Sequence, residues 1–121
     1  MNLILIAIGG ALGSVARYLF STFVLRATGS LFPAGTFAVN AVGCFVFGVI
    51  AGAAEQRVAI PPEMRAFLLI GVLGGFTTFS SYAFESFTLI RDGQLLWASM
   101  NLAGQVVIGV IGVAVGFAIM K

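Results

Sequence analysis

Glycines, hydroxyl groups and aromatic rings interrupt one long apolar segment of the chain. The segment extends from about Met64 to about Thr88, and the interruption, from Gly74 to Tyr82, reads GGFTTFSSY. Adjacent glycines weaken a helix, and backbone that leaves the helix in an apolar environment needs other partners for its polar groups. A break exposes carbonyl oxygens that attract cations and N–H groups that attract anions. The pattern predicts either an ion site or a simple kink without an ion.

The residues at and after the glycines carry groups suited to small ions. Aromatic rings have positive edges that can line an anion path, and hydroxyl donors can replace part of an anion's hydration shell. The candidate lining residues, on one helical stripe or beside it, are Phe79, Tyr82, Glu85, Ser86, Ser80, Thr77 and Thr78. Aromatic residues at this spacing are also typical of plain packing. If two subunits met at their breaks, the carbonyl oxygens of Gly74 and Thr77 would suit a hard cation such as sodium.

The composition indicates an all-α integral membrane protein. The chain has 121 residues, of which 60% are hydrophobic and 8% charged, so it cannot cover itself with a soluble surface. At about 20 residues per span the length allows about four transmembrane helices and no soluble catalytic domain. There is no histidine, and the single cysteine, Cys44, lies in an apolar run, where we expect a small buried hydrophobe rather than a reactive thiol. These features argue against an enzyme, a zinc site, a disulfide within the chain and nucleic-acid binding.

The apolar periodicity places the helices within a single transmembrane domain, residues 1–121. We expect them at about 3–25, 33–54, 64–90 and 95–120, with the third helix broken near 74–78. Each half of the broken helix is too short to cross about 30 Å of hydrocarbon alone, so the two halves form one span. Gly9 and Gly13 have the spacing that lets helix backbones approach closely in lipid.

Three polar residues within the predicted spans need an explanation. Arg17 either snorkels to the interface or attracts anions at an aqueous vestibule. Asn40 either joins helices or donates its amide hydrogens to a passing anion. Glu85, the only acid within a span, can face a vestibule, pair with an arginine or carry protons, and the sequence does not decide among these.

The loop charges give almost no preference for one orientation in the membrane. Three basic residues lie on the side of the termini, and two or three lie opposite, depending on Arg17. The first group is Arg57, Arg65 and Lys121, and the second is Arg26 and Arg91. Because positive charge normally sets topology, this balance predicts insertion in both orientations and an antiparallel, dual-topology homodimer.

Three motifs, in order along the chain, resemble the Fluc (CrcB) family of fluoride channels. They are GSVAR at 13–17, NAVGCF at 40–45 and GGFTTFSSYAFES at 74–86. The resemblance covers essentially the whole chain. It implies a homodimer in the bacterial inner membrane that passively exports fluoride through two pores around a central structural sodium ion.

The resemblance also implies roles for individual residues. Gly74 and Thr77 carbonyls would hold the sodium, Phe79 would be the first ring of the fluoride-lining box, and Asn40 and Ser80 would contact the anion. Arg17 would lie near the pore entrance. Tyr82 departs from the family, whose second box position is usually phenylalanine, and its phenol adds a donor at the far end of the ring.

Two other functions remain possible at this point. A small dual-topology transporter could use Glu85 as its proton-coupling acid, although that residue lies six positions past Phe79 and away from the break. A helical accessory subunit of a larger complex would explain the glycines but not the hydroxyl groups at the break.

Overall fold

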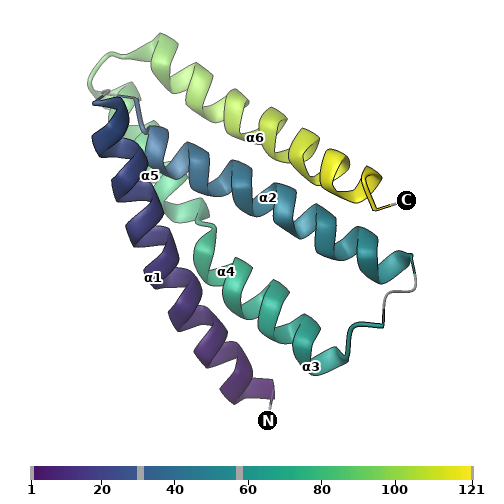
Figure 1. Cartoon of the computed structure of the whole chain (residues 1–121). Coiled ribbons are helices and arrows are strands. Elements are labelled where there is room, and N and C mark those ends of the chain that lie inside the picture. The colour runs from purple at the N-terminus through teal and green to yellow at the C-terminus, as the bar shows by residue number, and fades with distance from the viewer. Residues whose placement is uncertain (1, 30–31, 57–58, 121) are drawn as a thin grey trace.

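The computed structural model describes residues 2–29, 32–56 and 59–120. It contains four apolar helical spans, Asn2–Thr28, Ala34–Glu55, Pro62–Arg91 and Leu95–Ala118, each long enough to cross a membrane. The all-helical architecture with four such spans is therefore confirmed (Figure 1). Arg57 and Lys121, which entered the count of loop charges, lie outside the described residues.

The first helix, α1 (Asn2–Thr28), is longer than the sequence indicated. It continues three residues past the predicted end at residue 25 because Arg26, Ala27 and Thr28 do not break a helix. Gly29 then adopts a positive φ of 57°, and its N–H bonds to the Leu25 carbonyl at 3.0 Å. A left-handed glycine just past the last turn is a common way to end a helix.

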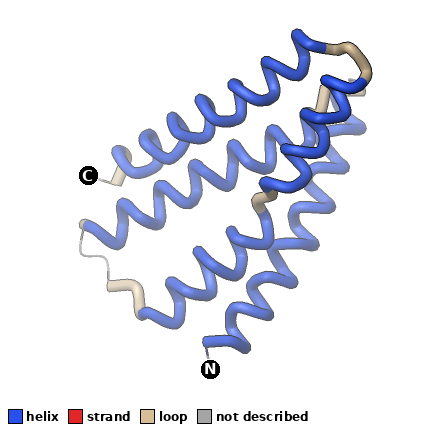
Figure 2. Tube along the Cα trace, turned by 180° about the vertical axis from the view of Figure 1, so that it is seen from behind, coloured by secondary structure: helices blue, strands red, loops and turns tan. Residues whose placement is uncertain are grey.

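The second and last helices, α2 (Ala34–Glu55) and α6 (Leu95–Ala118), pack along each other for most of their length (Figures 1 and 2). Glycines allow their backbones to approach closely. A Cβ atom on Gly52 would lie 2.8 Å from the Phe117 carbonyl oxygen, and one on Gly116 would collide with the Phe45 carbonyl oxygen. Helices in lipid associate through such close packing, so α2 and α6 form one closely packed pair.

The third span consists of four pieces. A short helix α3 (Pro62–Arg65) leads into a π-helix η1 (Ala66–Val72) and then into α4 (Leu73–Phe76). After the break, α5 (Phe79–Arg91) completes the crossing. The break appears as the tan loop in the middle of the third span in Figure 2. The π-helical turns were not predicted, because no sequence periodicity distinguishes them from an α-helix.

The break is narrower than the predicted 74–78 and comprises only Thr77 and Thr78. Gly74 and Gly75 remain helical, so the paired glycines do not themselves form the break. Gly75 instead serves packing, since a Cβ atom there would lie 2.6 Å from the Gly10 carbonyl oxygen of α1. The extended backbone begins at Thr77, two residues after Gly75.

Candidate ion pathway at the break in the third span

Two extended residues separate the two halves of the third span. Thr77 has φ −84° and ψ 157°, and Thr78 has φ −148° and ψ 122°. The first half ends where the Thr77 N–H bonds to the Leu73 carbonyl at 3.0 Å. The second half begins where the Thr78 hydroxyl accepts a hydrogen bond from the Ser81 N–H at 3.3 Å. Thr78 is thus a side-chain N-cap, which is a stabilising start for α5.

The break leaves the carbonyl groups of residues 74–77, Gly74 and Thr77 among them, without the N–H donors that a continuous helix would give them. In a continuous helix the Thr78 N–H would bond to the Gly74 carbonyl, whereas here it donates to Asn40 Oδ1 at 2.9 Å. The Ser81 N–H would bond to the Thr77 carbonyl, but it donates to the Thr78 hydroxyl. Gly74 and Thr77 therefore both keep carbonyl oxygens that are free of their usual helical donors.

The Asn40 carboxamide binds both backbone groups of Thr78. Its Oδ1 accepts from the Thr78 N–H at 2.9 Å, and its Nδ2 donates to the Thr78 carbonyl at 3.0 Å. The same Nδ2 donates to Gln105 Oε1 at 2.7 Å. A carboxamide nitrogen has two hydrogens, so both are already donated to the protein. Within the single chain Asn40 thus supports the break by bonding to both backbone groups of Thr78, while its expected contact with a passing anion stays a prediction.

A chain of buried amides continues from Asn40 into the interior. Gln105 Nε2 donates to Asn101 Oδ1 at 2.8 Å, and Asn101 Nδ2 donates to Ser86 Oγ at 2.8 Å. The sequence analysis did not assign Gln105 and Asn101 to the site. Two amides four residues apart in an otherwise apolar helix were the signal that could have identified them.

An open hollow of about 480 Å³ lies beside the break, and most of its surface is apolar. The predicted site residues that line it are Asn40, Gly74, Thr77, Thr78, Phe79 and Tyr82. The two aromatic rings lie together, with centroids 5.6 Å apart and planes tilted by 55°. Phe79 is 77% exposed, whereas the buried Tyr82 donates its hydroxyl to the Leu102 carbonyl at 2.6 Å.

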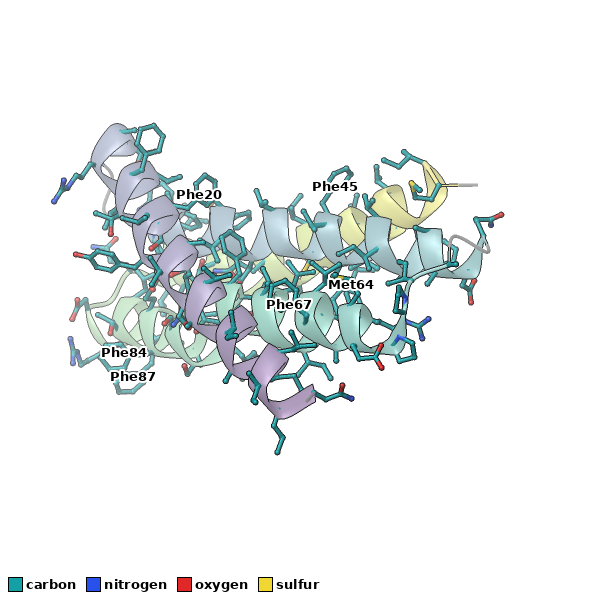
Figure 3. The ribbon with its side chains drawn as sticks, turned by 60° about the horizontal axis from the view of Figure 1, so that its bottom comes forward. Phe20, Phe45, Met64, Phe67, Phe84 and Phe87 are labelled. Carbon is teal, nitrogen blue, oxygen red and sulfur yellow. The ribbon has the colours of Figure 1, made fainter. Side chains whose placement is uncertain are left out.

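Four of the predicted residues do not line this hollow: Ser80, Arg17, Glu85 and the buried Ser86. Ser80 is exposed on the first turn of α5, and Arg17 is half-buried on α1. Glu85, also half-buried, accepts a hydrogen bond at 2.6 Å from the hydroxyl of Thr36 on α2. Figure 3 labels Phe84 and Phe87, which are both exposed on α5 and do not line the hollow.

Sequence comparisons assign this architecture to a family. A profile of the family described as CrcB-like protein, Camphor Resistance (CrcB), matches residues 4–117. A protein of Maridesulfovibrio salexigens named fluoride-specific ion channel FluC is 46% identical over 94% of this chain and 90% of its own length. Proteins of the same name from Chlorobium phaeobacteroides and an Anaeromyxobacter species are 47% and 49% identical, over 93% and 88% of this chain and 87% and 84% of their own lengths. A profile match over nearly the whole length, together with this level of identity, places the chain in the CrcB family, whose named relatives are fluoride-specific ion channels.

Proposed function

We propose that this protein is a fluoride-selective channel that passively exports fluoride from the cytoplasm of a bacterium across its inner membrane. The observation that carries the proposal is the hydrogen-bonded break in the third span, with two aromatic rings and an open hollow directly beside it. This arrangement occurs in a chain whose relatives are named fluoride-specific ion channels. Export down the electrochemical gradient lowers toxic cytoplasmic fluoride without a catalytic step.

The physical basis of anion selection lies in the first turns of α5. The N-terminus of a helix carries partial positive charge, and α5 begins at Phe79 in the middle of the third span. The edges of the Phe79 and Tyr82 rings add positive potential without a formal charge. The Ser80 hydroxyl is exposed at the same turn. A small anion can therefore shed water against several weak donors, while half-buried Arg17 draws anions toward one mouth of the path.

The proposal includes an antiparallel homodimer with two pores around one sodium ion. The near-equal loop charges support both orientations in the bilayer. Phe79, 77% exposed in the single chain, is available to a second copy. The Gly74 and Thr77 carbonyls lack their usual helical donors. Two copies would bring four such oxygens together, and unwound backbone carbonyls are known ligands of sodium in membrane proteins.

The proposal can be tested with purified protein in liposomes loaded with both fluoride and chloride. Ion-selective electrodes would record the two anions in parallel. We expect rapid fluoride release, with chloride retained, once a potassium ionophore removes the membrane potential. Release of both anions at similar rates would contradict selectivity, and release of neither would contradict the channel.

A proton-coupled transporter that uses Glu85 is the alternative. Against it, the Glu85 carboxylate is bonded to Thr36 and does not line the hollow beside the break. Glu85→Gln removes the proton site but keeps a group that can accept from Thr36. We expect fluoride flux in this variant to remain passive and insensitive to an imposed pH gradient. A wild-type flux that follows the proton gradient and is lost in Glu85→Gln would favour the transporter.

A further inference from the structure

The buried chain of side chains behind the break has a defined direction. Each nitrogen in it donates to the next residue, from Asn40 to Gln105, then to Asn101 and finally to Ser86. Asn101 is fully buried, Ser86 is 2% exposed and Gln105 is 9% exposed. Each of these groups must be satisfied inside the protein, because an unpaired polar group in an apolar interior is costly.

The backbone of Thr78 determines the orientation of every amide in the chain. Its N–H can only donate, so Asn40 must turn its oxygen toward it and its nitrogen toward the Thr78 carbonyl and Gln105. Gln105 must then present its oxygen to Asn40 and its nitrogen to Asn101. A flip of one amide would place donor against donor or acceptor against acceptor.

Ser86 ends the chain without imposing an orientation of its own. Its hydroxyl accepts from Asn101 Nδ2 at 2.8 Å, and a hydroxyl can rotate either to accept or to donate. The orientation of the amides is therefore set by Thr78 at the break. It is passed on by hydrogen bonds from α2 to α6 and from α6 to Ser86 on α5. The same half-helix is held at its N-cap by Asn40 and two turns later by Asn101.

We propose that Gln105 is a positioning residue for the helix break. By accepting the second hydrogen of the Asn40 nitrogen, it stabilises the carboxamide in the orientation that the backbone groups of Thr78 set, and so helps to fix where Phe79 and Tyr82 stand beside the hollow. The proposal rests on the proposed channel function and adds the residue that keeps its pore-lining rings in place. Without Gln105, one buried Asn40 hydrogen loses its acceptor, so the orientation of the amide that pairs with Thr78 becomes less stable.

The test uses Gln105→Met, which keeps the length of the side chain but removes both its donor and its acceptor. Val107→Met on the same helix is the matched control, because Val107 is 54% exposed and does not line the hollow. Hydrogen exchange at the Thr78 amide, which does not depend on conduction, is measured together with fluoride efflux. We expect about tenfold faster exchange and about tenfold slower efflux in Gln105→Met, the factor that a change of about 1.4 kcal/mol produces. Val107→Met should match the wild type in both.

A double-mutant cycle separates positioning from a direct role in the path. If Gln105 acts only through Asn40, the double variant Asn40→Ala/Gln105→Met should conduct no more slowly than Asn40→Ala alone. Effects that multiply in the double variant would overturn the proposal, as would unchanged Thr78 exchange in Gln105→Met. Wild-type protein that releases no fluoride, but whose Thr78 exchange responds to Gln105→Met, would contradict the channel function and leave the positioning role supported.

A smaller substitution, at Ser86, tests the series of hydrogen-bonded side chains at the end away from the break. Ser86→Ala removes only a hydroxyl, so it remains informative if Gln105→Met does not fold. We expect hydrogen exchange at Thr78 to become faster, but by a smaller factor than in Gln105→Met. The reason is that Asn101 loses its acceptor, which weakens the series of hydrogen-bonded side chains at the end away from Thr78. No change in Thr78 exchange in this variant would contradict the proposed coupling along the chain.

Discussion

The two halves of the third span are held in place by different chemistry. The first half, through η1 and α4, packs on α1 at glycines, where backbones touch: a Cβ atom on Gly9 would lie 2.7 Å from the Phe67 carbonyl oxygen. Within the described residues, no side-chain hydrogen bond joins α1 to this half. The second half, α5, is instead tied to α2 and α6 by side-chain hydrogen bonds. The residues that make these bonds are the N-cap Thr78 and, within α5, Tyr82, Glu85 and Ser86.

This difference shows how one short chain can combine a closely packed half, which supports the fold, with a half that carries polar groups. In lipid, glycine contacts give close packing of helices without polar side chains, whereas hydrogen bonds hold helices together through polar side chains. The break separates these two kinds of contact. The first half of the third span therefore depends on an unbroken surface of small residues. The second half depends on hydrogen-bond partners that are held in the correct orientation.

The largest effect on folding should come from the glycine contacts of the first half. A Cβ atom at Gly13 would collide with the Val72 carbonyl oxygen and lie 2.9 Å from the Phe76 nitrogen. Gly13→Ala should therefore lower stability by about 1–3 kcal/mol, the usual cost of overpacking, seen as a lower melting temperature in detergent. Gly10→Ala is the control, since nothing lies within 4 Å of a Cβ atom there. It should leave the melting temperature equal or higher, and equal losses in the two variants would contradict the comparison.

A smaller effect should follow from loss of the N-cap of the second half. Thr78→Val keeps the shape of the side chain but removes the hydroxyl that accepts from the Ser81 N–H. We expect a loss of about 1 kcal/mol, as for other N-cap deletions, with faster hydrogen exchange confined to the first turn of α5. Thr78→Ser keeps the hydroxyl and should restore most of the protection. Slower exchange in Thr78→Val, or a change spread over α1, would show that the cap does not hold this half.

The smallest effect should come from the phenol of Tyr82. Tyr82→Phe removes one hydrogen bond to the Leu102 carbonyl but keeps the ring beside Phe79. The expected loss is about 0.6 kcal/mol, the average for hydrogen bonds between membrane helices, with fluoride efflux close to the wild-type rate. Tyr18→Phe, at a residue 68% exposed on α1, should change neither quantity. A complete loss of efflux in Tyr82→Phe would mean that the hydroxyl itself takes part in conduction.

The features that depend on the local pattern of residues could be predicted from the sequence. Long apolar runs indicated the four spans, and the cluster of glycines and hydroxyls indicated that the third span is interrupted. Helical spacing placed Phe79 and Tyr82 on one stripe, and the two rings do lie together. Each of these features is set by residues within a few turns of one another.

The partners of the break could not be inferred in the same way. Asn40 is 38 residues from Thr78 and 65 from Gln105, and periodicity does not report which helices become neighbours. An apolar helix with two amides indicates only that they need partners. The pairing of Asn40 with both backbone groups of Thr78, which occupies its amide hydrogens, depends on how α2, α5 and α6 pack.

The central claim is that the ring of Phe79, placed by the break, makes the path for fluoride. Phe79→Ile removes the ring edge, and because the residue is 77% exposed in the single chain the change should not disturb the fold of the protomer. Phe84→Ile is the matched control, at a residue 64% exposed on the same helix and away from the hollow. The measurement is fluoride efflux from liposomes for wild type and both variants, with folding checked by gel filtration. We predict abolished efflux in Phe79→Ile and wild-type efflux in Phe84→Ile, whereas unchanged efflux in a folded Phe79→Ile variant would remove Phe79 from the path and contradict the account.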